Sequence, residues 1–343
     1  MRRRRLTIVA VVLALVLVFG YLNRSSIRNV WDQVTGADYV GNGYGSVTLV
    51  IQPGETGQDV ANALVKAGVV KNFRIVYQLL VARDQTFYPG SYELREQMSS
   101  LSALNALSDS KNRITNVVVI KEGYRLSNTF NALSKATGLA VEELKSAAGD
   151  LTAIGVPSGE VSAEGWLFPA TYSFDPGLTA QQMLAQMVER TKQELGRYSV
   201  APKDWHRVLT LASVVQKEGR QTPDFYKISR VFLNRLAAGM NLQSDATVSY
   251  GVSGNTVETS AADRANPNGY NTYVHPGLPI GPISAPGSVA IDAALHPAEG
   301  KWLYFCAVNL ATGETVFSNT YDEHQVAVRQ WQAWMRANPG YGG

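Results

Sequence analysis

The chain has 343 residues, of which 45% are hydrophobic, and it carries 31 basic and 28 acidic side chains for a formal charge of +3. This length suffices for about two globular domains, and this hydrophobic fraction excludes a disordered scaffold. Four of the positive charges are Arg2 to Arg5, so the rest of the chain has a net charge of −1 (+3 − 4), which argues against a nucleic-acid surface.

Residues 6–22, LTIVAVVLALVLVFGYL, form an uncharged apolar run directly after the arginines. At about 1.5 Å per residue, a helix of this length just crosses a hydrocarbon core of about 30 Å. The charge bias predicts a cytoplasmic tail at 1–5, a transmembrane helix at 6–22 and an extracytoplasmic remainder at the plasma membrane. A cleaved signal peptide is the alternative, but the following FGYLNRSS lacks an A-x-A-like cleavage site.

Residues 23–45 are rich in Gly, Asn and Ser, which is typical of a stalk. Residues 47–70 then predict a strand, a Pro-Gly turn and a helix that Thr56 caps at its start and Gly68 at its end. Two more helices are expected within 72–84 and 99–109, and a strand is expected between them, within 88–94. This part of the chain is predicted to be a small α+β module.

Residues 116–148 again have the order strand, turn, helix, turn, helix. Their spacing resembles the LysM module, which binds N-acetylhexosamine sugars, although Tyr124 and Arg125 replace its usual aspartate and threonine. A generic packing unit of one strand and two helices is the alternative. We therefore predict a small LysM-like α+β region at 46–150, followed by a larger mixed α+β domain at 151–343.

The second region has three recognisable parts. Residues 164–177, EGWLFPATYSFDPG, suit an extended and partly buried segment, and residues 180–195 suit an amphipathic helix. Residues 266–287 are dense in Gly, Pro, Asn and Tyr. Loops of this kind shape binding clefts, so we expect a site there.

Glu218 stands at the end of the helix-like run LASVVQKEGR, residues 211–220. On a wheel of about 100° per residue, Glu218 lies about 20° from Leu211, within the apolar stripe that includes Val214 and Val215. Gln216 lies roughly 140° from Leu211 and Lys217 roughly 120° in the other direction, and both are expected to face solvent or a polar neighbour. Glu218 is therefore the inward-facing carboxylate of this run.

An inward carboxylate has two explanations. Arg235 falls in the apolar stripe of the next predicted helix and is positioned to hold Glu218 as a structural ion pair, although Asp245 competes for the same arginine. Alternatively, Glu218 is catalytic, since apolar neighbours and the negative end of a helix dipole both raise the pKa of a carboxylic acid. A carboxylic acid that stays protonated near neutral pH can act as a general acid.

Other chemistries have less support. The four histidines occur at no metal-ligand spacing, and neither H-E-x-x-H nor C-x-x-C occurs, so we predict no metal and no cofactor. Glu122 and Glu164 are further acids in suggestive contexts, but both lie beside glycines at turns and rank below Glu218.

Five motifs together resemble the YceG-like family of endolytic murein transglycosylases. They lie between about residue 45 and residue 330, in the order and spacing of that family: LASVVQKEGR, ISRVFLNRLAAGMNLQSDATVSYG, YNTYVHPGLPIGPISAPG, AALHPAEGKWLYFCAV and FSNTYDEH. The resemblance assigns the family's catalytic glutamate to Glu218, the last acid of an EKE pattern. The chain departs from the family at three positions. Gln216 replaces the first acid of the EKE pattern, and Ala170 replaces the aspartate of the family's FPDTY. Ala246 replaces the proline of the family's DPTV, a change that is expected only to loosen a turn.

The resemblance implies a lytic cleavage of the MurNAc-GlcNAc β-1,4 bond that needs one carboxylate. The C6 hydroxyl of MurNAc attacks its own anomeric carbon, which leaves a 1,6-anhydro end, and Glu218 would act as acid and base. The residues predicted to contact the substrate are Gln243, Asp245, Asn271, Thr272 and Tyr273. The implied partners are peptidoglycan glycan strands, the plasma membrane through the N-terminal helix and, as a further candidate, peptidoglycan synthases.

Two other functions remain open at this point. A non-catalytic peptidoglycan-binding scaffold would use Glu218 only to brace its fold. A muramidase hydrolase would use Asp245 to position a water molecule, where most glycosidases use a second carboxylate.

Overall fold

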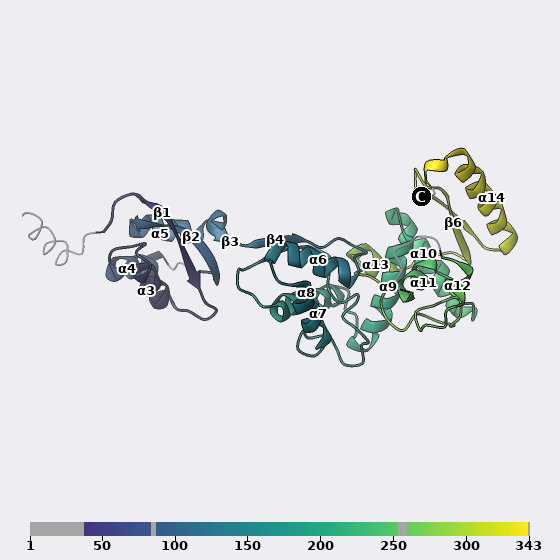
Figure 1. The fold of residues 1–343 in the computed structure, drawn as a ribbon, viewed down its shortest axis with the longest axis horizontal. Coiled ribbons are helices and arrows are strands. Elements are labelled where there is room, and N and C mark those ends of the chain that lie inside the picture. The colour runs from purple at the N-terminus through teal and green to yellow at the C-terminus, as the bar shows by residue number, and fades with distance from the viewer. Residues whose placement is uncertain (1–37, 84–86, 253–258, 342–343) are drawn as a thin grey trace, which may run out of the picture. The chain divides into compact units, whose positions relative to one another are not determined.

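The computed structural model describes residues 38–83, 87–252 and 259–341. The predicted cytoplasmic tail and transmembrane helix, and most of the predicted stalk, lie outside these ranges. Within them, no helix combines the length and the apolarity that a membrane crossing requires. The chain divides into two compact units between Thr115 and Asn116, and most of their elements are labelled in Figure 1.

The first unit is a small α+β domain. Its three-stranded antiparallel sheet has the order β1-β2-β3, and its helices pack on one common apolar core. The elements are β1 (Asn42–Ile51), α3 (Gly57–Lys66), α4 (Phe73–Arg83), β2 (Gly90–Met98), α5 (Ser100–Ser108), the 3-10 turn η1 (Ser110–Asn112) and β3 (Arg113–Ile114).

The local signals in the first unit confirm the predicted helix after the Pro-Gly turn. The Thr56 hydroxyl accepts the Asp59 N–H while the Asp59 carboxylate accepts the Thr56 N–H, which is the reciprocal capping box that this spacing favours. Val60 and Leu64 are buried on the inner face of α3. The last residues of the predicted stalk, from Asn42 onward, already belong to β1, so order begins earlier than predicted.

The second unit is larger and mainly helical, with two separate two-stranded antiparallel sheets, β4-β5 and β6-β7. Its strands are β4 (Asn116–Val119), β5 (Thr171–Phe174), β6 (Tyr304–Asn309) and β7 (Glu314–Ser318). Its α-helices are α6 (Leu126–Thr137), α7 (Val141–Gly149), α8 (Ala180–Arg197), α9 (Trp205–Glu218), α10 (Thr222–Ala237), α11 (Asp245–Gly251), α12 (Ala261–Ala265), α13 (Ser288–Leu295) and α14 (Tyr321–Ala337), with 3-10 turns at η2 (Pro202–Asp204) and η3 (Pro339–Tyr341).

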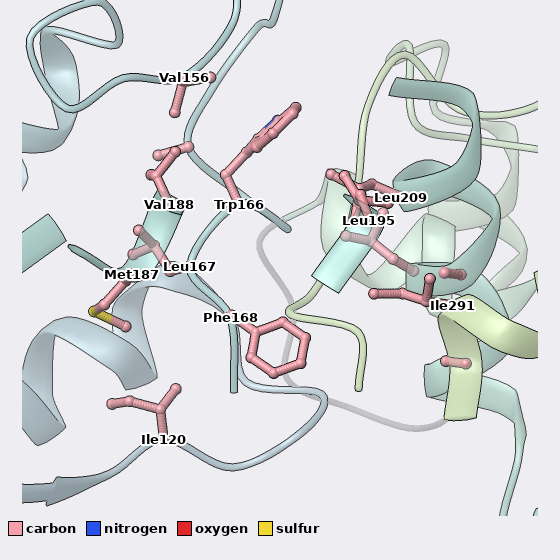
Figure 2. Close-up of a cluster of buried hydrophobic side chains, with 14 of the residues drawn as sticks. Ile120, Val156, Trp166, Leu167, Phe168, Met187, Val188, Leu195, Leu209 and Ile291 are labelled. Atoms are coloured by element: carbon pink, nitrogen blue, oxygen red, sulfur yellow. The ribbon is translucent and has the colours of Figure 1, made fainter. Parts of the chain in front are cut away.

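One apolar core extends through the second unit, from residue 118 to residue 293. Trp166, Leu167 and Phe168 lie in the middle of this cluster, with side chains of α8 and α9 around them (Figure 2). The same cluster includes Val118 of β4 and Phe130 of α6, and β4 pairs with β5. The predicted domain boundary at residue 150 therefore differs from the observed division, because strand and helices 116–149 pack on the larger unit.

Candidate functional site

Glu218 is the last residue of α9, and the wheel prediction of its direction agrees with the burial of Leu211, Val214 and Val215 on the same stripe. Glu218 itself is partly buried. The helix ends here because Gly219 leaves the helical conformation. A Cβ at Gly219 would lie 2.7 Å from the ring of Phe225, so only glycine permits this close approach.

The residue directly before α11 holds the Glu218 carboxylate. The Ser244 hydroxyl donates to Glu218 Oε1 over 2.6 Å, and the backbone N–H of Ala246, in the first turn of α11, helps to lower the pKa of the same carboxyl group. Burial nevertheless raises the pKa of Glu218 above its usual value, and the charge of Asp245 raises it further, whereas the two donors and Lys217 lower it. Glu218 is thus a carboxyl group with a raised pKa and a fixed orientation.

Ala246 adds a backbone group beside Glu218. Proline, the residue usual at this position in the resembled family, has no N–H to donate. The Ala246 N–H helps to lower the pKa of Glu218, and the expectation that this change loosens a turn stays a prediction.

The two polar residues before Glu218 face polar surroundings, as predicted. Gln216 is half-buried, and its side-chain oxygen accepts the Gly287 N–H over 2.9 Å. A carboxylate oxygen would accept the same donor, so the glutamine preserves the contact that the family's first acid can make. Lys217 is exposed.

Arg235 does not pair with Glu218 in the described part of the chain. Its Nε donates to the Leu303 carbonyl over 2.6 Å, and its Nη1 donates to the Leu242 carbonyl over 2.8 Å and to the Asn241 carbonyl over 3.3 Å. The side chain is only 8% exposed, so these backbone acceptors satisfy a buried cation. The structural ion pair that the sequence left open is therefore replaced by a clamp on the loop before α11.

Asp245 and Tyr273 lie close to Glu218. Asp245 Oδ1 accepts the Tyr273 hydroxyl over 3.1 Å and the Thr259 hydroxyl over 2.5 Å, and Arg264 Nη1 lies 3.9 Å away. Burial raises the pKa of Tyr273 to about 12, and the charges of Asp245 and Glu218 contribute to this shift. The Tyr273 phenol thus stays protonated and remains a hydrogen-bond donor at neutral pH.

The other three predicted contact residues differ in their exposure. Gln243 is exposed and has a φ of 52°, a left-handed conformation that non-glycine residues rarely adopt. Asn271 is fully buried and donates to the Asn266 carbonyl over 2.7 Å, and the Thr272 hydroxyl is buried and accepts the Ser244 N–H over 3.1 Å. Asn271 and Thr272 therefore hold the loops that position Ser244.

The sequence ranked Glu164 low and did not single out Ser244. Glu164 is only 2% exposed, and its Oε2 accepts the Leu126 N–H over 3.1 Å and the Tyr250 hydroxyl over 3.2 Å. Burial raises the pKa of Glu164 to about 7. The signal for Ser244 was its place directly before Asp245, at the N-cap of a short helix.

A Glu164→Gln variant is expected to flatten the pH dependence of stability. Unfolded Glu164 ionises near 4.5 and folded Glu164 near 7. The folded state therefore binds the extra proton, and the free energy of unfolding falls as pH rises through this window, by about 3 kcal/mol at most. Urea unfolding at pH 5 and pH 8 should show a smaller fall for the variant; an equal fall in both proteins would contradict the assignment.

A groove of about 670 Å³ lies in the first unit, where Arg95, Asn105 and Asp109 are among its lining residues. None of the predicted site residues lines it. The case for the site around Glu218 therefore rests on its chemistry.

The chain is similar to proteins named endolytic murein transglycosylase. The one from Bacillus subtilis is 29% identical over 307 residues, which is 83% of this chain and 85% of that protein. The one from Streptococcus pneumoniae is 28% identical over 350 residues, which is 92% of this chain but 62% of that longer protein.

A solved structure and a family model also match the chain. A crystal structure of a putative YceG-like protein from Listeria monocytogenes matches with a TM-score of 0.55 and 29% identity, over 82% of this chain and 99% of that one. The model of the YceG-like family matches residues 49–330, which include Glu218, Ser244 and Asp245. Because this match extends over most of the chain, the protein belongs to the YceG-like family.

Proposed function

We propose that the protein is an endolytic lytic transglycosylase that cleaves the MurNAc-GlcNAc β-1,4 bond of peptidoglycan strands. The observation that carries this proposal is an oriented carboxyl group, Glu218, whose burial raises its pKa and which the Ser244 hydroxyl holds in place. The names of the relatives from Bacillus and Streptococcus support the same substrate.

In the proposed reaction, Glu218 carries both proton transfers. The protonated carboxyl gives its proton to the glycosidic oxygen as the C1–O bond breaks, so the leaving sugar departs with a hydroxyl group. The resulting carboxylate then takes the proton of the MurNAc C6 hydroxyl as that oxygen bonds to C1. This closes the 1,6-anhydro ring, returns the proton to Glu218 and consumes no water.

The surroundings of Asp245 fix one of its two carboxylate oxygens. Its Oδ1 accepts two hydroxyl groups, from Thr259 and Tyr273, so this oxygen holds the loop. Gln243, Asp245 and Tyr273 are the proposed substrate contacts, Asp245 through its other oxygen, because the side chains of Asn271 and Thr272 are used by the fold.

The remaining proposals concern the place of action. Residues 6–22 are proposed to anchor the protein in the plasma membrane with residues 1–5 in the cytoplasm, which puts the catalytic unit outside, beside newly made strands. Residues 46–150 are proposed to include a LysM-like glycan contact, and peptidoglycan synthases are the candidate protein partners.

Digestion of uncrosslinked peptidoglycan strands with the full chain tests the proposed function. Mass spectrometry of the products is expected to show internal cleavage with 1,6-anhydro-MurNAc ends. Reducing MurNAc ends would identify a hydrolase. Binding of the strands with no cleavage would identify a scaffold.

Removing the N–H or O–H group that faces Glu218 is expected to raise the pH at which kcat/KM falls on the alkaline side. Ser244→Ala deletes a hydrogen bond to the ionised form, and Ala246→Pro removes the N–H that helps to lower the pKa of Glu218, since proline is tolerated in the first turn of a helix. A charge-assisted bond contributes about 1.5–3 kcal/mol, so Ser244→Ala should raise the alkaline limb of kcat/KM by about one to two pH units, and Ala246→Pro should raise it by less. Unchanged limbs in both variants would show that Glu218 does not set the profile.

A further inference from the structure

Two cationic side chains, Lys217 beside Glu218 and Arg125 near Lys217, have no role in the proposed reaction. Arg125 immediately precedes α6, and Lys217 immediately precedes Glu218 on α9. A Cβ built on Gly123 would lie 3.9 Å from Lys217 Cδ. The stem of Lys217 therefore packs on the turn that leads into Arg125.

Arg125 is held in place from several sides. Its guanidinium carbon lies 5.2 Å from the centre of the Tyr250 ring, and its Nη2 donates to the Ser249 hydroxyl over 3.4 Å. The buried carboxylate of Glu164 attracts Arg125 and accepts hydrogen bonds from Leu126 N–H and from the Tyr250 hydroxyl. Glu164 thus ties the start of α6 to the end of α11, with the guanidinium between them.

The short helix α11 sets the spacing between this cation and the acid. Ser244, directly before its start, holds the carboxylate of Glu218, and Ser249, five residues later, contacts Arg125. Five residues of helix rise about 7.5 Å, or roughly one and a half turns. The contacts of Glu218 and of Arg125 with α11 are therefore about this far apart along the helix axis.

The ammonium group of Lys217 is open to an anionic ligand. Its stem is partly buried, and this burial together with the charge of Arg125 lowers the pKa of Lys217. In the described part of the chain, Lys217 forms no ion pair within 4 Å, and its side chain reaches solvent. An anion bound there would stabilise the charged forms of both cations.

We propose that Arg125 and Lys217 form a subsite that binds a carboxylate of the glycan strand, with Glu164 and Tyr250 as positioning residues for Arg125. The inference rests on the proposed function, since it concerns the same substrate. A guanidinium fork and an ammonium group together suit a carboxylate, the first by paired hydrogen bonds and the second as a point charge. The carboxylate comes either from the peptide attached to MurNAc or, where the peptide has been removed, from the lactyl group.

Binding affinities in a Glu218→Gln background test this subsite without cleavage. The probes are uncrosslinked peptide-bearing strands and the same strands after chemical amidation of their carboxylates. We expect the charged strands to bind about fivefold more tightly for each cation engaged, as one exposed ion pair contributes up to about 1 kcal/mol. Lys217→Gln should reduce this preference about fivefold, whereas Lys203→Gln, in η2 at the opposite end of α9, should preserve it.

Arg125→Gln should also reduce the preference for charged strands, and Arg125→Lys tests the same contact if Arg125→Gln fails to fold. Arg125→Lys retains the charge but loses the fork and the full ring contact, so a partial loss of the preference is expected. Equal affinity for charged and amidated strands, or a preference that survives Lys217→Gln, would overturn the subsite.

Two comparisons separate the remaining possibilities. Peptide-free strands carry only lactyl carboxylates, so a preference that persists with them assigns the lactyl group, and one that disappears assigns the peptide. Cleavage by the wild-type protein without charge preference would overturn the subsite alone. Absence of both binding and cleavage would overturn the proposed function as well.

Discussion

A Glu218→Gln variant is expected to lose cleavage of peptidoglycan strands by about 10²- to 10⁴-fold, since it removes the group that we propose makes both proton transfers. Glutamine keeps an oxygen that accepts the Ser244 hydroxyl, so the loop before α11 should stay in place. Initial rates of strand cleavage, measured by the release of new chain ends, check this expectation.

The stability of the same variant supplies its control. Because burial raises the pKa of Glu218, the ionised form destabilises the fold near neutral pH, and the variant should unfold at an equal or higher temperature. Glu189→Gln, which changes an exposed acid on α8, should cleave at the wild-type rate. A folded Glu218→Gln variant that still cleaves at that rate would exclude Glu218 as the acid.

An Arg235→Met variant is expected to lower the free energy of unfolding by about 3 kcal/mol, because it leaves the carbonyls of Leu303, Leu242 and Asn241 without their donor. These carbonyls belong to the segment before β6 and to the loop before α11. Urea unfolding at constant pH measures the effect.

Arg230 provides a matched comparison on the same helix. It is half-exposed, and its Nε donates to the Ala298 carbonyl, so Arg230→Met should cost only about 1 kcal/mol. If Arg235 instead formed an ion pair with Glu218, its removal would raise the pKa of Glu218 and move the alkaline limb of activity upward. We expect activity of the folded Arg235→Met variant to fall at the same alkaline pH as that of the wild-type protein.

Features with a local cause could be predicted from the sequence. The direction of Glu218 follows from the helical period and from the apolar residues on the same stripe. The Thr56 capping box follows from residues three positions apart. Both depend on neighbours within about one helical turn, so no knowledge of the tertiary fold was needed.

Features that depend on distant partners could not be predicted in the same way. Arg235 binds a carbonyl at residue 303, which no side-chain pattern reveals. Asn271 and Asp245 are both polar, but only the fold shows that the Asn271 amide is used by neighbouring carbonyls. The division at residues 115 and 116 likewise depends on the pairing of β4 with β5.

Ala246 shows a further limit of residue types. A change from the family's proline to alanine looks like a loss of rigidity in the sequence. In the structure it adds a backbone N–H that helps to lower the pKa of Glu218. Side-chain patterns therefore predicted the direction of Glu218, while backbone groups and long-range contacts determine how its charge is balanced.

Cleavage in water enriched with heavy oxygen tests the central claim most directly. If the C6 hydroxyl of MurNAc is the nucleophile and Glu218 only moves protons, mass spectrometry should find no heavy oxygen at the new MurNAc ends, and these ends should be 1,6-anhydro rings. Incorporation of one heavy oxygen at each new MurNAc end would show that water attacks, and would contradict the proposed transglycosylase mechanism.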